Sequence, residues 1–463
     1  MHHDRPAQTV NVTAEMSAEL WKSAARVLEM NWSGDHMVPS RLLYPHQWSW
    51  DTAFIAIGLA YVNPSRAWRD LRSLFEAQWP DGRVPHIVFD PQTAEDDYFP
   101  GPGFWQVPAY AKRPAHGSTG LVQPALHAVA AWEVYRRAAG HGAASAHEAR
   151  TELAWLYPRL VAQQEYLTGR RDAGGSGLAS IVHPWESGLD NSPAWDAAMS
   201  AVPVDRTLLD RYHRRDTEVA DAAHRPTDVD YARYVGLVLS YRDGGYSDTD
   251  LAQRHDFVVE CPNFNAILGA AEMALTQIAG VVGADPDQHH GRARRITGAI
   301  VDRLYDPVTG TFRARDVRTG TLSPARCVSG LTPLILPHLP AVHAAAIIRE
   351  AESARFGLPE QTELPAPSYD RTAPDFDPLR YWRGPIWINV NWLLRRGMLL
   401  HGYPEQAEDL RSAMLKLVHR SGHFEYFHPD TGAGIGAPSF SWTAALSLDL
   451  LADRSVPAFA RLS

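Results

Sequence analysis

Apolar residues recur along most of the chain with the spacing of an α-helix. In residues 14–31, Met16, Leu20, Ala24, Val27 and Met30 lie three or four positions apart and share one face, as expected for a helix packed on a core. The same spacing indicates helices at 64–78, 121–139, 146–167, 229–239, 263–283, 289–304, 341–354, 387–400, 404–419 and 441–452. The pattern therefore predicts an all-α protein.

Strand-like alternation is rare, and its clearest case is GHFEYFHPDTG at residues 422–432. An alternating run that meets an Asp-Thr-Gly turn is typical of a β-hairpin. The chain carries no Pro-, Gly- or Ser-rich linker between its helical segments, as a boundary between domains would require. We therefore expect one domain over residues 1–463, with a small β-hairpin near the C-terminus.

Aromatic or polar loop segments open a helix at regular intervals along the chain. They stand at Trp48, Gln123, Asp190, Asn263, Trp387 and Trp442, with a weaker example near Leu331. The spacing of roughly 55 to 75 residues corresponds to one helical hairpin per interval. This spacing predicts an (α/α)6 barrel, whose inner helices begin at one rim and carry long loops there. An irregular helical bundle with chance spacing is the alternative.

Composition and charge argue against nucleic acid as a partner and against a disulfide-linked fold. The 463 residues are 45% hydrophobic and carry a formal net charge of -9, without a long run of Lys or Arg. Proteins that bind nucleic acid usually show a basic patch, so nucleic acid is not an expected partner. The two cysteines, Cys261 and Cys327, are too few for a disulfide framework and are interpreted as reduced core residues.

Localisation is predicted from the N-terminus and from the longest apolar run. The segment MHHDRPAQTV lacks the apolar stretch of a secretory signal, and AFIAIGLAYV (residues 53–62) is shorter than the roughly 20 residues that span a bilayer. We expect a cytoplasmic protein that does not cross a membrane, and homo-oligomerisation is left open.

The chain is rich in aromatic residues where loops are expected. It contains 15 Trp and 17 Tyr, and the stretch YPHQWSWD (residues 44–51) places several polar and aromatic groups directly before a helix. Asp51 is positioned to cap that helix, because a carboxylate accepts the free N–H groups of a first turn. It also suits a sugar hydroxyl beside Trp48, since sugar sites combine stacked aromatic rings with carboxylates and amides.

Two carboxylates are candidates for acid–base chemistry. In WESGLDNSP, Ser192 and Pro193 have the signature of a helix start, so Asp190 should point out of the preceding loop. Nearby tryptophans would raise its pKa by desolvation, as a general acid requires. Glu186 is close enough in the sequence to compete for this role. The alternative is that Asp190 is a cap or turn residue without a catalytic role.

The second candidate, Glu425, lies in HFEYFHP and shares a strand face with His423 and Phe427. The alternative is a solvated glutamate at a sheet edge.

Four motifs in order resemble one known family. QWSWD, WESGLDNSP, YWRGPIWINVNWLL and GHFEYFHPDTG followed by FSWTAAL are similar to glycoside hydrolase family 63, most of all to its bacterial members that act on glucosylglycerate and mannosylglycerate. The resemblance runs from about residue 44 to residue 450. It implies an (α/α)6 barrel and hydrolysis with inversion at the anomeric carbon. By the same resemblance, Asp190 is the general acid and Glu425 the general base.

The resemblance also implies the binding residues. The residues expected to line the sugar site are Tyr44, Trp48, Asp51, Gln123, Trp185, Gly188, Tyr381, Trp382 and Trp387. The segment HRPTDVDYARY (residues 224–234) resembles a segment that holds glycerate, which indicates Arg225 and Tyr231. The expected reaction is cleavage of 2-O-α-glucosyl-glycerate, or its mannosyl analogue, to free sugar and D-glycerate.

Several alternatives stay open at this point. Arg225 could form a surface ion pair with Asp228 or Asp230, in which case a neutral α-linked disaccharide becomes the expected substrate. Contacts to the aglycone around Tyr98 and residues 434–437 are not assigned.

Other motifs point to weaker alternatives. GAGIGA (residues 432–437) lacks the Lys of a phosphate-binding loop and is interpreted as a flexible hairpin exit. HExxH and CxxC are absent from the sequence, so neither a metal nor another cofactor is expected. His46, His183 and His423 keep open a sugar epimerase or isomerase of the same fold. A non-catalytic sugar-binding protein is a third class, and product analysis separates the three.

Overall fold

The computed structural model describes residues 12–111, 117–140, 142–211, 214, 217, 221–357 and 363–452. The N-terminal segment on which the expected localisation partly rested lies outside these residues. Six elements form a closed inner ring, in which each contacts the next and the last contacts the first. They are α2 (Ser49–Leu59), α5 (His127–Ala139), α12 (Pro262–Val282), η7 (Thr332–Ile335), α16 (Ile388–Leu400) and α18 (Ser441–Ala452).

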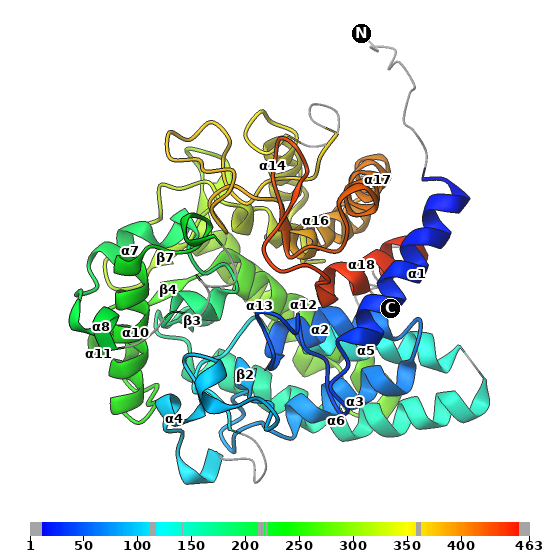
Figure 1. The fold of residues 1–463 in the computed structure, drawn as a ribbon, viewed down its shortest axis with the longest axis horizontal. Helices are drawn as coiled ribbons and strands as arrows, with labels where there is room; N and C mark the ends of the chain where they lie inside the picture. Colours follow the sequence, from blue (N-terminus) through cyan, green and yellow to red (C-terminus); the bar gives the residue numbers. More distant parts are fainter. Residues whose placement is uncertain are drawn as a thin grey trace.

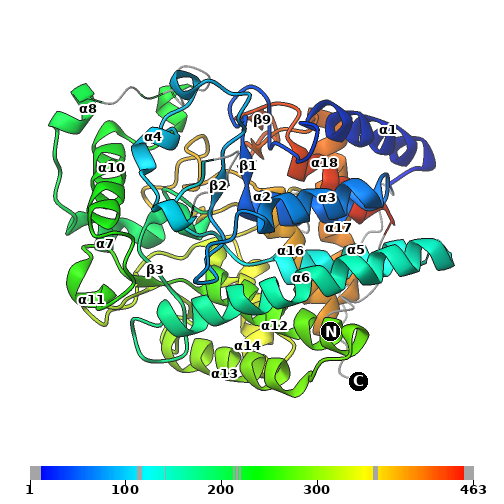
Figure 2. The same ribbon diagram turned by 90° about the horizontal axis from the view of Figure 1, so that it is seen from below.

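A second set of helices surrounds this ring. It comprises α1 (Ala14–Met30), α3 (Pro64–Phe75), α6 (Ala143–Arg170), α13 (Asp287–Leu304), α14 (Ala341–Ala351) and α17 (Pro404–Ser421). The helices α3, α6, α13 and α17 pack on the inner helices that precede them in the chain, and α1 packs on α18. Figure 2 shows α2 and α3 lying alongside α5 and α6. The predicted (α/α)6 barrel is confirmed, and one inner position is filled by the 3-10 helix η7 instead of a full α-helix.

Burial distinguishes the two rings. Every residue of α2 is buried, whereas α3 buries one face and exposes the other, as its amphipathic sequence requires. The inner helices also approach closely: a Cβ atom at Gly58 of α2 would lie 2.0 Å from the main-chain oxygen of Ala445 in α18. Glycine therefore sets the distance between the first and last inner helices.

The helix α12 has the length and composition of a membrane-spanning segment. In this structure it occupies the inner ring, where most of its residues, Glu272 included, are buried. The sequence predicted this helix at residues 263–283, but the longest uninterrupted apolar run lies elsewhere, because small and polar residues interrupt the apolar residues of α12. The expectation of a single domain stays a prediction.

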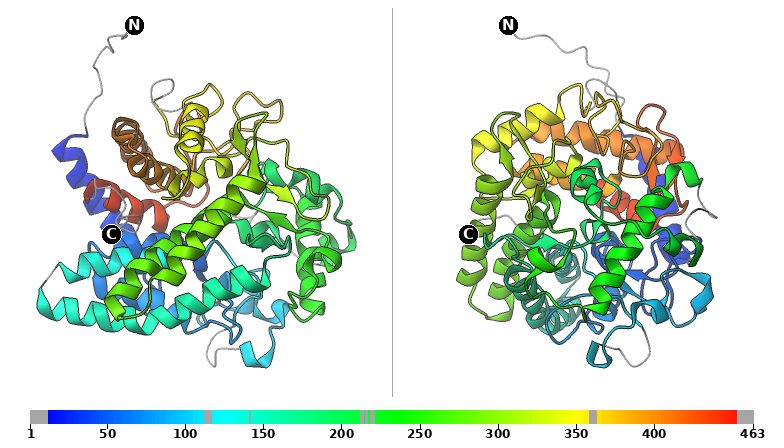
Figure 3. Two further views of the ribbon diagram at one scale, coloured as in Figure 1. Left: turned by 180° about the vertical axis from the view of Figure 1, so that it is seen from behind. Right: turned by 90° about the vertical axis from the view of Figure 1, so that its left-hand side faces the viewer.

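Between α6 and α12 the chain makes a long excursion. Its elements are β3 (Ser180–Ile181), η3 (Pro184–Ser187), η4 (Pro193–Trp195), α7 (Asp196–Ser200), α8 (Thr207–Arg211), η5 (Ala222–His224), α10 (Asp228–Asp243), α11 (Leu251–Arg254) and β4 (Val259–Glu260). Figures 1 and 3 show that α7, α8, α10 and α11 lie on the side of the molecule opposite α1. The loop at Asp190 therefore opens short helices of this excursion, and its assignment to the start of a barrel helix was wrong.

The strands are short antiparallel pairs near the rim. They are β1 (Gln47–Trp48) with β2 (Ile87–Val88), β4 between β3 and β7 (Arg315–Asp316), β5 (Tyr305–Asp306) with β6 (Thr311–Phe312), and β8 (Tyr426–Phe427) with β9 (Gly434–Ile435). The pair β8–β9 confirms the predicted C-terminal hairpin. GAGIGA was wrongly interpreted as a hairpin exit, because it supplies the second strand.

Short helical turns complete the described elements. They are η1 (Glu95–Asp97), α4 (Pro102–Trp105), η2 (Ala109–Ala111) and η6 (Val328–Gly330). The helix expected from residue 121 begins at His127; residues 121–126 have no helical structure and face the cavity through Gln123.

Candidate active site

A cavity of about 580 Å³ opens at the rim where the inner helices begin. Its wall combines residues from the starts of inner helices, from the excursion and from the C-terminal hairpin. The predicted site residues that line it are Tyr44, Trp48, Asp51, Gln123, Trp185, Gly188, Asp190, Arg225, Tyr231, Tyr381, Trp382 and Glu425. Residues more than 300 positions apart in the sequence thus meet in one concave, aromatic and acidic site, as a sugar-binding cavity requires.

Glu425 directly precedes β8 and is 1% exposed. Its Oε1 atom accepts hydrogen bonds from the hydroxyl groups of Tyr44 (2.8 Å) and Tyr381 (3.2 Å), and Oε2 accepts one from the main-chain N–H of Ala437 (3.1 Å). Burial raises the pKa of Glu425, while the nearby Arg225 guanidinium and these hydrogen bonds lower it in part. The carboxyl group is therefore held in one orientation, and the alternative of a solvated edge glutamate was wrong.

Asp190 lies in the turn between η3 and η4. The Tyr234 hydroxyl donates to its main-chain oxygen (3.1 Å), and the Trp195 indole donates to the main-chain oxygen of Leu189 (2.9 Å). The Ser192 hydroxyl accepts from the N–H of Ala194 at the start of η4, so the predicted cap and its Pro193 are present, on a 3-10 helix. The hydrogen bonds from Tyr234 and Trp195 thus hold the main chain of the turn at Asp190 and Leu189, and Asp190 lines the cavity.

Gly188 begins the same turn with φ +70°. A Cβ atom there would lie 2.5 Å from the ring of Trp50. Only glycine permits both this backbone conformation and the close approach to α2.

Asp51 stands in the first turn of α2, where Trp48 is the N-cap residue and provides no side-chain cap. One acceptor for the first turn is Gln123, whose Oε1 receives the N–H of Trp50 (3.1 Å). The carboxyl group of Asp51 hydrogen-bonds its own main-chain N–H in the same turn, in line with the expected capping role, and Asp51 also lines the cavity. Burial and then the charge of Glu425 raise the pKa of Asp51 well above its ordinary value.

Trp387 is the predicted site residue that the structure places behind the cavity wall. It is fully buried and stacks on Trp382 with ring centres 3.9 Å apart and planes 4° apart. It also stacks on Tyr426. Its placement in the sugar site was wrong, because its ring supports Trp382 from behind.

Arg225 is buried at the cavity, at 7% exposure. Its Nη2 atom donates to the Tyr44 hydroxyl (3.3 Å), and its guanidinium lies 4.2 Å from the centre of the Tyr381 ring. The ion pairs expected as the alternative involve other arginines: Arg214 contacts Asp228, and Arg380 and Arg233 contact Asp230. The surface ion-pair interpretation of Arg225 was therefore wrong.

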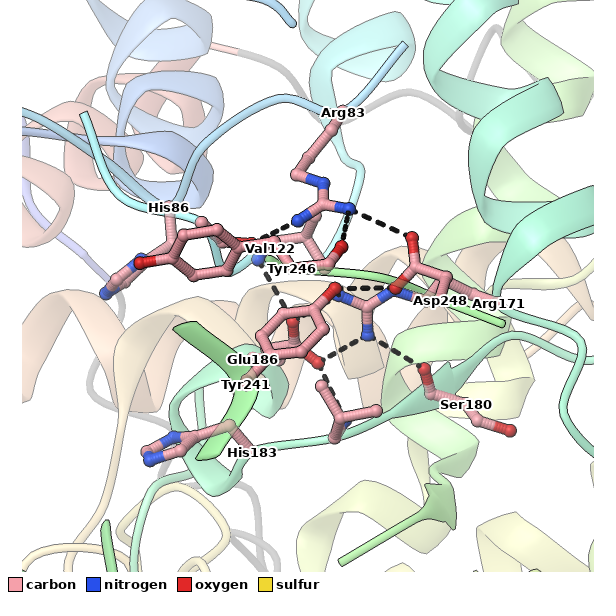
Figure 4. Close-up of polar contacts among 12 residues, drawn as sticks. Arg83, His86, Val122, Arg171, Ser180, His183, Glu186, Tyr241, Tyr246 and Asp248 are labelled. Carbon is pink, nitrogen blue, oxygen red and sulfur yellow. Dashed lines mark hydrogen bonds and ion pairs between the residues drawn. The ribbon is translucent and has the colours of Figure 1, made fainter. Parts of the chain in front are cut away.

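Glu186 competed with Asp190 for the role of acid on sequence alone. The structure buries it completely and pairs it with Arg171 through two hydrogen bonds of 2.7 and 2.8 Å (Figure 4). A carboxylate in this pair lies behind the cavity lining and has no access to a glycosidic oxygen.

The three histidines that kept an isomerase open are also buried outside the cavity lining. Burial lowers the pKa of His46 and His423 to about 4 and that of His183 to about 3.

Several lining residues were not predicted. They include Trp50, His86, Tyr98, Trp105, Tyr234, Phe440 and Trp442. The motif FSWTAAL already contained a signal for Phe440 and Trp442, because it opens a helix as QWSWD does. His86 and Trp105 carry no such signal, since His86 directly precedes β2 and Trp105 is the last residue of the short helix α4.

The (α/α)6 barrel with acidic and aromatic residues around its rim cavity is the architecture of a glycoside hydrolase, and the family comparison identifies the chain as one. The model of the mannosylglycerate hydrolase MGH1-like glycoside hydrolase domain matches residues 44–443. The chain belongs to this family, within glycoside hydrolase family 63.

Known relatives cover nearly the whole chain. It is 38% identical to a mannosylglycerate hydrolase of Rubrobacter radiotolerans, over 94% of this chain and 97% of the relative. It is 34% identical to a glucosylglycerate hydrolase of Mycolicibacterium hassiacum, over 94% and 98%. The crystal structure of the family 63 mannosylglycerate hydrolase from Thermus thermophilus in complex with Tris and D-glycerate superposes with a TM-score of 0.84 at 37% identity, over 93% of this chain and 99% of that chain.

Proposed function

We propose that this enzyme is an inverting hydrolase of 2-O-α-glucosyl-glycerate or its mannosyl analogue, which it cleaves to the free sugar and D-glycerate. The observation that carries the proposal is the joint presence of Asp190 and Glu425 in one cavity, with Glu425 buried and oriented by two tyrosine hydroxyls. The relatives named for mannosylglycerate and glucosylglycerate support the substrate class.

In this mechanism Asp190 protonates the glycosidic oxygen while Glu425 removes a proton from the attacking water. The bond between the anomeric carbon and that oxygen breaks, and water adds to the opposite face, so an α-glycoside gives a β-configured sugar. The sugar lies among Trp48, Asp51 and Trp382. The two aromatic rings suit the apolar C–H faces of the sugar, and the carboxyl group suits its hydroxyl groups.

The glycerate carboxylate requires a donor, because an unpaired charge in a cavity is costly. Arg225 offers a guanidinium in the cavity and Tyr231 a hydroxyl. Replacing Arg225 by Ala should weaken glycerate-linked substrates by about 1.5 to 3 kcal/mol, as for a charged hydrogen bond. A neutral aryl α-glycoside should be barely affected at a pH where Glu425 is ionised. Equal losses on both substrates would favour a neutral α-glucoside instead.

Product analysis tests the function directly. The purified enzyme is incubated with the α-glucoside and the α-mannoside of glycerate and with kojibiose, nigerose and trehalose, and the first products are followed by NMR. We expect two products from a glycerate glycoside, with the β-anomer of the sugar formed first. A first-formed α-anomer would contradict inversion, and a single isomerised product would indicate an epimerase or isomerase.

A further inference from the structure

A buried cluster of charged side chains lies behind the cavity wall (Figure 4). It contains two cations, Arg83 and Arg171, and two carboxylates, Glu186 and Asp248, whose side chains are between 0 and 4% exposed. The charges of these four side chains balance, and the partly exposed Asp81 also contacts Arg83 Nη2 (3.5 Å). Opposite charges in contact tolerate burial that a single charge would not. The acid–base steps proposed above use none of these four residues.

Glu186 joins two distant stretches of main chain. Its Oε1 accepts the N–H of Val122 (3.2 Å) and its Oε2 accepts the N–H of Val182 (2.8 Å). Val122 precedes Gln123, which lines the cavity, and Val182 lies between β3 and η3, in the segment that leads to the turn of Asp190. The Arg171 guanidinium supplies one further donor to each oxygen. A carboxylate is the side chain suited to this place, because it has only acceptors and can receive four donors.

Arg171 extends the same network to α10. It stands at the C-terminal end of α6, and its Nη2 atom donates to the Tyr241 hydroxyl of α10 (3.3 Å). The Tyr241 hydroxyl donates to Asp248 Oδ1 (2.5 Å). The helix α10 also carries Tyr234, whose hydroxyl donates to the main-chain oxygen of Asp190. The network thus holds the turn of Asp190 from its N-terminal side and holds the helix that contacts Asp190 itself.

The second ion pair of the cluster, Arg83 with Asp248, lies next to the chain segment that precedes Gln123. Arg83 donates from Nη2 to Asp248 Oδ2 (3.0 Å) and from Nη1 to the main-chain oxygen of Gly120 (2.8 Å). The segment before Gln123 is therefore fixed at two points, at Gly120 by Arg83 and at Val122 by Glu186.

We propose that Glu186 is a positioning residue for the general acid: its ion pair with Arg171 holds the turn of Asp190 in register with the wall segment that carries Gln123. The proposal rests on the proposed function. Proton transfer depends steeply on geometry, and a displacement of about 1 Å is sufficient to lower a rate by about 10²-fold. Glu186→Gln keeps the shape of the side chain, but it places an NH2 group against N–H donors and removes the carboxylate that receives two hydrogen bonds from Arg171.

Substrates with different leaving groups test this role. A glycerate glycoside needs protonation of its leaving oxygen, whereas an α-glycosyl fluoride departs with little help from an acid. We expect Glu186→Gln to lower kcat/KM on the glycerate glycoside by about 10- to 10²-fold and on the fluoride by about 3-fold or less. Asp190→Asn should show the same selectivity to a larger extent.

A matched control is provided by Glu272, which is also fully buried. It pairs with Arg292 (3.0 Å) and His289 (2.8 Å) between α12 and α13, away from the cavity. Glu272→Gln should lower the unfolding midpoint and leave the ratio of the two substrates unchanged. Equal losses of Glu186→Gln on both substrates would mean a merely structural role and would overturn the proposal.

Tyr241→Phe is a milder variant for the case that Glu186→Gln does not fold. It keeps every charge and the direct Arg171–Asp248 ion pair (3.1 Å), and it removes the hydroxyl through which Arg171 holds α10, the helix whose Tyr234 contacts Asp190. It should reduce kcat/KM on the glycerate glycoside by about 3-fold or more relative to the fluoride, and an unchanged ratio would overturn the proposal. Failure of the proposed function would give a different result from failure of the Glu186 proposal. In that case the wild type would not cleave glycerate glycosides, or Asp190→Asn would show no dependence on the leaving group.

Discussion

The charge of Arg225 should set the pH at which Glu425 becomes able to act as a base. Burial raises the pKa of Glu425, and the Arg225 guanidinium is the largest opposing influence. A general base acts in its ionised form, so activity falls as the pH drops through its pKa. Replacing Arg225 by Gln removes the cation, and the acidic limb of the pH profile should move to higher pH.

The size of this shift follows from the geometry. Arg225 Nη2 lies 3.3 Å from the Tyr44 hydroxyl, which lies 2.8 Å from Glu425 Oε1, so the charged atoms are at most about 6 Å apart. With an effective dielectric constant of about 20, their attraction is about 2.8 kcal/mol, or about 2 pKa units. Water that enters the space left by the arginine reduces this value, and we expect a shift of about 1 to 2 units.

The assay is kcat/KM against pH, because this profile reports the pKa values of the free enzyme. A neutral α-glycosyl fluoride is the substrate, so that loss of glycerate binding does not enter the result. Arg225→Lys is the matched control: it keeps the charge, and its acidic limb should stay within about 0.5 unit of the wild type. An unchanged limb in Arg225→Gln, or a shift to lower pH, would refute either the role of Glu425 as base or its coupling to Arg225.

Three further predictions concern the catalytic pair, the turn and the cysteines. Asp190→Asn and Glu425→Gln should each lower kcat on a glycerate glycoside by about 10² to 10⁴-fold with unchanged circular dichroism, and an active Asp190→Asn would contradict the acid assignment. Gly188→Ala combines a positive φ with a clash against Trp50 and should lose about 1 to 3 kcal/mol of unfolding free energy, more than Gly175→Ala, which has a positive φ in open space; equal losses would mean that the ring moves aside. Burial raises the pKa of both cysteines to about 12, so a thiol reagent should label them only after denaturation, and rapid labelling of the native enzyme would contradict their burial.

The sequence predicted the barrel because its inner helices are apolar and begin after aromatic or polar loops. Five of the predicted loops open a full inner helix or lead into one, as QWSWD leads into α2. The position near Leu331 gave a weak signal because η7 is only four residues long. The loop at Asp190 looked like the others in sequence, but it opens a 3-10 turn and a five-residue helix. Loop chemistry alone does not reveal how long the following helix will be.

The site residues came from motif resemblance, and the errors arose where a role depends on distant neighbours. The sequence indicated Asp51 as a cap of its own helix but not Gln123, 72 residues later, which accepts the first-turn N–H of Trp50. Trp387 was placed in the cavity because it belongs to a recognised motif, whereas its ring stacks behind Trp382. A one-dimensional pattern identifies which residues gather at a site and leaves open which of them face its interior.

The two candidate catalytic carboxylates both stand outside the barrel helices. Asp190 lies on the excursion and Glu425 on a hairpin, whereas Asp51 stands in the first turn of α2 and Gln123 in the segment that leads into α5. Helix packing fixes residues on the inner ring, but a turn needs other constraints, and for Asp190 these are the buried charges behind it. A packing change in the ring, such as Gly58→Ala between α2 and α18, should therefore reduce stability and leave the preference between glycoside and fluoride unchanged. Changes in the charged cluster, by contrast, should alter that preference, because the cluster holds the chain segment that leads to the acid.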